Sequence, residues 1–156
     1  MLEDILEAFT KANEETITKF EKASNISLSE DYRNFLLEYN GGDFVENIYI
    51  EGFNIAISEK VAFEIKRLYG LVSDDETYST KNLKKINDLI KDGIVDWPSN
   101  FLIIGSISNG HDYISISIDS NTKGSVYVIS DEMPEMRIKI SDTFSQFLDI
   151  IKKYDV

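Results

Sequence analysis

The sequence predicts an α+β fold in which helices pack on a mainly antiparallel sheet, and three observations support this class. Residues 101–130 have the pattern of a three-stranded antiparallel meander, in which apolar strands are separated by turn residues. Helical periodicity precedes this stretch and returns in the last residues. Strands and helices do not alternate regularly, as they would around a parallel sheet. The 156 residues show no linker, repeat or low-complexity segment, so we expect a single domain over residues 1–156.

The first part of the chain is expected to form N-terminal helices. In residues 2–20 apolar side chains recur three and four positions apart, which predicts one long amphipathic helix or two short helices with a break near Asn13. A further helix is expected over residues 30–39, because Ser29 can cap it and acidic residues fill its first turn. Residues 40–42, Asn-Gly-Gly, tolerate left-handed conformations and favour a tight exit from that helix.

The middle of the chain is expected to form a small hairpin and then an inserted pair of helices. Residues 48–50 and 53–55 are apolar and flank a turn at Gly52. Helical spacing then predicts helices over residues 60–69 and 82–92, and in the second of these Leu89 belongs to the inward face. The polar segment between the two helices is expected to be an exposed loop.

The meander is expected to be covered on one side only. In residues 113–118 isoleucines alternate with Ser115 and Ser117, so the serines share one face of the sheet. We expect that serine face to be open to water and available for binding. After the meander, a strand is expected over residues 137–140 and a closing helix over residues 142–153, capped by Ser141.

The composition provides little catalytic chemistry. The chain has one histidine and no cysteine, so thiolate ligands and a cysteine nucleophile are excluded and general bases are scarce. The formal net charge of -12 argues against direct nucleic-acid binding, which needs clustered basic residues. The N-terminus is acidic and no apolar run is long enough to span a bilayer, so we expect a cytoplasmic protein without a membrane segment. We predict no catalytic residue, metal site or cofactor.

A few polar residues are candidates for chemical sites. His111 lies beside Asp112 in a predicted turn, but no nucleophile accompanies it, so we interpret it as a turn histidine. Residues 119–124 resemble the start of a calcium loop, but the glutamate that such a loop needs at its twelfth position is missing, so a hairpin turn is expected. Paired carboxylates, such as Asp131 with Glu132 or Asp112 with Asp119, leave a carboxylate-based hydrolase as a less favoured alternative. Trp97 is expected to fill the core rather than a binding surface.

Two separated segments together resemble the SMI1/KNR4 family, also called the SUKH superfamily. Residues 15–44 are similar to the helix, the Leu-Pro-x-x-Tyr helix start, the Phe-Leu pair and the closing Asn-Gly-Gly of the family, with Ser29 where proline is usual. Residues 101–131, followed by the Ser-Asp-Thr-Phe and Phe-Leu of residues 141–148, are similar to its strands and its closing Ser-Phe-x-x-Phe-Leu. Residues 59–96 are covered least.

The resemblance implies a binding protein without catalytic residues. Many bacterial members of the family are immunity proteins that neutralise a cognate polymorphic toxin, frequently a nuclease, by direct contact. Fungal members act in regulation, which leaves an intracellular regulatory or scaffold protein as the alternative. An acidic surface suits a nuclease partner, whose active-site groove must be basic to hold phosphates. The candidate partner-binding residues are acidic or aromatic and lie in two segments: Asp43, Phe44 and Glu46, and Asp74, Asp75, Glu76 and Tyr78.

Overall fold

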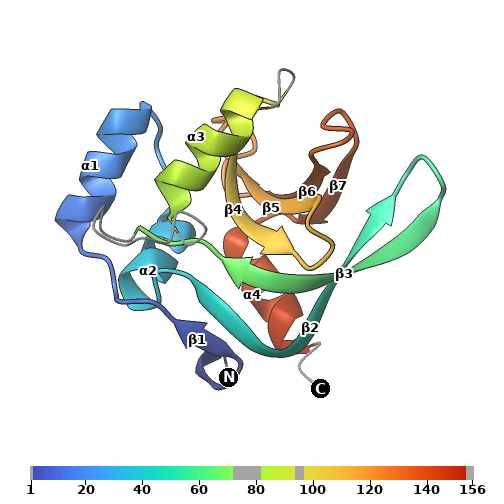
Figure 1. Cartoon of the computed structure of the whole chain (residues 1–156), viewed down its shortest axis with the longest axis horizontal. Coiled ribbons are helices and arrows are strands. Elements are labelled where there is room, and N and C mark those ends of the chain that lie inside the picture. The colour runs from blue at the N-terminus through green and yellow to red at the C-terminus, as the bar shows by residue number, and fades with distance from the viewer. Residues whose placement is uncertain (1, 72–81, 94–96, 154–156) are drawn as a thin grey trace.

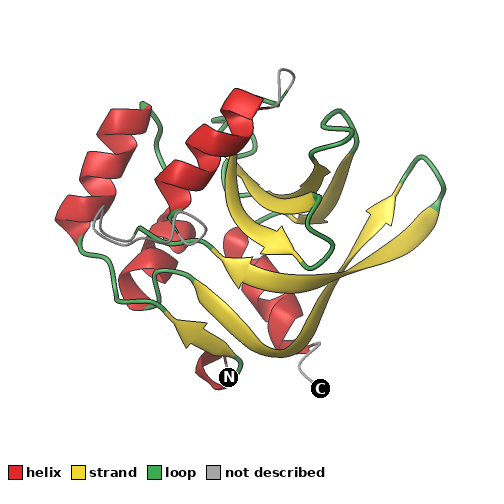
Figure 2. Cartoon of the chain, in the orientation of Figure 1, coloured by secondary structure: helices red, strands yellow, loops and turns green. Residues whose placement is uncertain are grey.

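The computed structural model describes residues 2–71, 82–93 and 97–153 and confirms the α+β class (Figures 1 and 2). Its sheet has seven strands in the order β1-β2-β3-β4-β5-β6-β7, and every neighbouring pair is antiparallel. The strands are β1 (Leu6–Ala8), β2 (Gly42–Asn54), β3 (Glu59–Leu68), β4 (Phe101–Ile107), β5 (Asp112–Ser117), β6 (Val126–Ser130) and β7 (Arg137–Ser141). The helices are a 3-10 turn η1 (Leu2–Asp4), α1 (Glu14–Ser24), α2 (Glu30–Glu38), α3 (Leu83–Gly93) and α4 (Phe144–Lys153). None of the helices in these ranges is long and apolar enough to cross a membrane.

The helix predicted over residues 2–20 forms only in its second half. Leu2 and Ile5 are buried in the core, and β1 pairs with β2, so that Leu6 faces Phe44. Residues 6–8 therefore form a strand at the free edge of β2, although their apolar spacing also fits a helix. Pairing with a neighbouring strand overrides the local helical periodicity. The predicted break at Asn13 is confirmed, because its Oδ1 accepts a hydrogen bond from the amide of Thr16 at 2.8 Å and caps α1.

Two predictions for the middle of the chain are wrong. No hairpin turns at Gly52; β2 continues unbroken to Asn54 and turns back into β3. The helix predicted over residues 60–69 is β3 itself, in which Phe63 and Ile65 alternate inward and pair with Ile50 and Ile48 of β2. The apolar residues of this segment fit the helical period as well as the alternation of a strand. Pairing with the long strand β2 favours the strand. The inserted helical pair is therefore reduced to α3 within the described residues.

The meander is confirmed as β4, β5 and β6, but the serine face is not open to water. Ser115 is 0% exposed and Ser117 is 1% exposed. Ser115 pairs with Ile103 on one side and Tyr127 on the other, and Ser117 pairs with Phe101. Large neighbours on adjacent strands therefore cover these small side chains. The prediction of a free serine face is wrong for this reason.

Two buried asparagines complete the hydrogen bonding where strands end. Asn87 of α3 donates from Nδ2 to the carbonyl of Ile103 and accepts at Oδ1 from its amide, both at 2.8 Å. Asn40 does the same for Leu71 beyond the end of β3, at 3.0 and 2.8 Å. In both cases a side-chain amide takes the place of a missing strand. The face of α3 differs from the prediction as a result: Asn87 is buried and Leu89 is 65% exposed.

The C-terminal helix begins two residues later than predicted. Thr143, not Ser141, is its N-cap: Thr143 Oγ1 accepts from the amide of Gln146, and Gln146 Oε1 accepts from the amide of Thr143. This reciprocal pair is a capping box. Asp31, at the start of α2, joins the two helices because its Oδ2 accepts from the amide of Ser145 at 2.9 Å.

Candidate functional site

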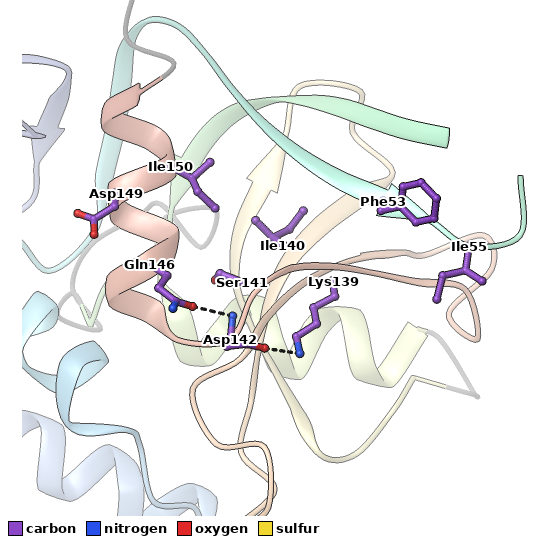
Figure 3. A pocket seen from close by; sticks show the side chains of 9 residues that line it. All are labelled: Phe53, Ile55, Lys139, Ile140, Ser141, Asp142, Gln146, Asp149 and Ile150. Carbon is purple, nitrogen blue, oxygen red and sulfur yellow. Dashed lines mark hydrogen bonds and ion pairs between the residues drawn. The ribbon is translucent and has the colours of Figure 1, made fainter. Parts of the chain in front are cut away.

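A groove lies between the far end of β2, strand β7 and helix α4 (Figure 3). Its volume is about 620 Å³. The lining residues come from these three elements, from the β2–β3 turn and from the turn before α4: Phe53, Ile55, Lys139, Ile140, Ser141, Asp142, Gln146, Asp149 and Ile150. Segments far apart in the sequence thus form one concave surface.

Gly52 brings β2 against β7 at the start of the groove. A Cβ at this position would lie 2.5 Å from Cγ2 of Ile138 and 3.1 Å from the carbonyl oxygen of Lys139. Only a residue without a side chain permits this approach. Beyond Gly52 the β2–β3 hairpin continues as an arm that projects away from the helices (Figure 1), and the groove lies beneath it.

The arm carries large apolar side chains that the core does not cover. Phe53 is 52% exposed, Ile55 is 83% exposed and Ile57 is 56% exposed. Tyr49, further back on β2, is also exposed, and its hydroxyl donates to Glu64 of β3 at 3.2 Å. Grouped exposed apolar residues of this kind mark surfaces that bind other molecules.

The opposite wall of the groove, formed by β7 and α4, combines two isoleucines with polar and charged side chains. Lys139 forms an ion pair with Asp142, and this hydrogen bond raises the pKa of the lysine. Gln146 is held by the amide of Asp142 at 3.1 Å. Asp149 is exposed on α4 and pairs with none of the side chains that the structure describes. The groove therefore offers apolar contacts on one wall and a carboxylate on the other.

Of the residues proposed from the sequence, Asp43 and Phe44 lie outside the groove. Asp43 accepts a hydrogen bond from Nε of Arg67 on β3, with its side chain 35% exposed. Phe44 is half-buried and packs against the core. The side chain of Glu46 and the segment 74–78 lie outside the described residues, so their part in binding stays a prediction.

Of the polar residues that the sequence offers as catalytic or metal-binding candidates, three lie close together and the others lie apart. Nδ1 of His111 lies 3.5 Å from Oδ1 of Asp131 and 3.5 Å from Oε1 of Glu132. Asp112 instead accepts from the side chain of Asn109, and Asp119 lies at the other end of β5. The pair of Asp112 and Asp119 therefore does not converge.

Sequence reasoning missed the groove. The one local signal is that Phe53, Ile55 and Ile57 alternate, in a run that begins within residues 53–55, which the sequence predicts as the second strand of a short hairpin. Trp97 is buried, as expected, with its ring edge-on to Tyr113 at a centroid distance of 6.3 Å. Residues 119–124 form the expected turn between β5 and β6, where Oδ1 of Asp119 accepts from the amide of Asn121.

A comparison with protein families finds a match over most of the chain. A family model described as SMI1 / KNR4 family (SUKH-1) matches residues 11–150, which is most of the chain. The matched range includes both halves of the groove. No curated protein matches the chain.

Proposed function

The chain belongs to the SMI1/KNR4 family (SUKH-1), and on this premise we propose that it is an immunity protein that neutralises a cognate toxin by direct contact. Members of this family are immunity-protein-like. The observation that supports a binding role most is the groove, where the exposed apolar arm faces an acidic wall.

The partner that suits this surface is a basic protein. The formal net charge of the chain is -12, so its field attracts cationic surfaces and repels nucleic acid. A nuclease toxin presents a basic groove to its substrate, and an acidic protein that covers this groove excludes the phosphates. Neutralisation then needs no chemistry from the immunity protein.

The two walls of the groove have different tasks in this mechanism. Phe53 and Ile55 supply the apolar anchors, since buried aromatic and aliphatic side chains provide most of the affinity at protein interfaces. Asp149 supplies a carboxylate for a basic side chain of the toxin. The acidic segments around Asp43 and around Asp74 add steering charge that speeds association.

The experiment offers the purified protein to the toxin encoded beside its own gene and measures both binding and toxin activity. We expect stoichiometric binding and loss of toxin activity. Phe53→Ser together with Ile55→Ser should weaken binding at least about 30-fold, as expected when anchor residues are removed. Leu89→Ser is the matched control, because Leu89 is a similarly exposed apolar residue on α3, outside the groove.

A second pair of variants tests the charge. Asp149→Asn should weaken binding at low salt, whereas Asp92→Asn, an exposed carboxylate on α3, should leave it unchanged. Absence of binding and inhibition would exclude the immunity function. Capture of several intracellular partners without protection from the toxin would favour the regulatory alternative instead.

A further inference from the structure

We propose that His111, Asp131 and Glu132 form a binding site for a divalent transition metal ion of the zinc class. The three side chains extend from the β4–β5 turn and from the segment that follows β6. None of them lines the groove, so this site is separate from the proposed toxin-binding surface and does not depend on it.

The donor atoms are spaced as ligands of one metal ion are spaced. Nδ1 of His111 lies 3.5 Å from a carboxylate oxygen of Asp131 and 3.5 Å from one of Glu132, and the three donor atoms lie within 4.8 Å of one another. Two ligands of a tetrahedral zinc ion, each bound at about 2.0–2.1 Å, are themselves about 3.4 Å apart. The imidazole contacts are longer than ordinary N–H···O hydrogen bonds of about 2.9 Å. An ion bound between these atoms would fit both distances.

The chemistry of the donors selects the metal. One neutral imidazole and two carboxylates carry two negative charges, which balance a divalent cation. An imidazole nitrogen suits zinc and its neighbours, whereas calcium and magnesium prefer oxygen ligands throughout. Three protein ligands leave a fourth position for water, as in zinc sites that are not purely structural.

The backbone fixes the two halves of the site relative to each other. The amide of Asp131 donates to the carbonyl of His111 at 2.8 Å, one position beyond the pairing of Asp112 with Ser130. Oδ1 of Asn109 accepts from the amide of His111 at 2.9 Å and holds the turn. The ligands therefore start from adjoining strand ends, so metal binding requires only side-chain rotation.

The test uses a property of this chain, which contains one histidine and no cysteine. Protein freed of metal and of any histidine tag is titrated with zinc chloride, while calorimetry measures affinity and nuclear magnetic resonance follows the imidazole. We expect one zinc ion per chain and a shift of the single imidazole signal that is complete at saturation. Calcium or magnesium chloride should leave that signal in place.

Ligand variants identify the site. His111→Ala and Glu132→Gln should each weaken zinc binding at least about tenfold, and because His111 is 61% exposed and Glu132 is 68% exposed, neither should disturb the fold. Glu135→Gln is the matched control, since it removes the same charge from an exposed residue of the same loop. An imidazole signal unmoved by zinc, or unchanged affinity in His111→Ala, would show only an ion pair between histidine and carboxylates and would overturn the proposal.

Discussion

Replacing Asn87 with alanine should destabilise the protein more than any exposed substitution on the same helix. Asn87 is 6% exposed, and its side chain forms both hydrogen bonds that Ile103 makes beyond the end of β3. Ile103 is 0% exposed, so Asn87→Ala leaves an amide and a carbonyl without partners in the core. Each such group costs about 1–3 kcal/mol, which gives about 2–6 kcal/mol for the two.

Because water can reach the site, the loss of stability in Asn87→Ala should fall in the lower part of that range. Asn87 borders a pocket of about 220 Å³ between α1, α3 and β4, through which water can reach the space left by the amide. We therefore expect a loss of about 2–3 kcal/mol, which corresponds to a melting temperature lower by about 4–12 °C for a domain of this size.

Urea and thermal unfolding followed by circular dichroism measure this loss, and hydrogen exchange locates it at the amide of Ile103, which should lose protection. Leu89→Ala is the matched control on α3, and because Leu89 is 65% exposed it should change stability by no more than about 0.5 kcal/mol. A larger loss in Leu89→Ala than in Asn87→Ala would refute the reasoning, since it would mean that α3 packs with the face that its apolar periodicity indicates.

Three further predictions concern a core hydroxyl, the β2–β7 crossing and the acidic segment. Tyr32→Phe should not lower stability at neutral pH, because the buried hydroxyl has no hydrogen-bond partner among the described residues. Burial raises the pKa of Tyr32, so the wild type should lose stability as the pH rises above the ordinary value of 10.0, and pH-dependent unfolding should show a smaller loss in the variant. Gly52→Ala should cost about 1–3 kcal/mol in urea unfolding through overpacking against β7, and should also weaken toxin binding; unchanged values would contradict the close crossing. Asp74→Asn with Asp75→Asn should slow association with the toxin more than it speeds dissociation and should flatten the salt dependence, as measured by surface plasmon resonance; an unchanged association rate would exclude a steering role.

The parts of the fold that local sequence patterns decide could be predicted. The meander follows from alternating isoleucines and turn residues, and α2 follows from the acidic residues of its first turn. Ser29 precedes α2 as predicted, but its hydroxyl donates to Oδ1 of Asp31 and does not cap the helix. The apolar residues of β3 fit a helix and a strand equally well, and pairing with β2 makes the choice. The segment around Leu6 becomes a strand only because β2 offers an edge.

Less of the candidate site than of the fold could be predicted, because the groove depends on contacts between segments that are far apart in the sequence. The acidic character of the surface follows from composition. The groove needs the crossing at Gly52, which brings β2 to β7, and a lone glycine in an apolar stretch also suggests a turn. The neighbours of Ser115 come from two other strands, so its burial could not be inferred from alternation alone.

The order of the strands has a consequence for how the chain folds. Each strand pairs with the next one in the sequence, so every ladder can form as soon as its second strand has been synthesised. Four of the six ladders join strands that a single turn or loop separates, whereas β1–β2 and β3–β4 enclose helices. Only those four ladders close small loops, and such local pairings form quickly. The contacts that must wait for the C-terminal residues include the crossing of β2 over β7 at Gly52 and the hydrogen bond of Asp31 to the first turn of α4. Until these contacts form, the apolar side chains of the arm are not yet packed over β7 and α4. A nascent chain at this stage exposes the most apolar surface and is therefore the form most prone to aggregate.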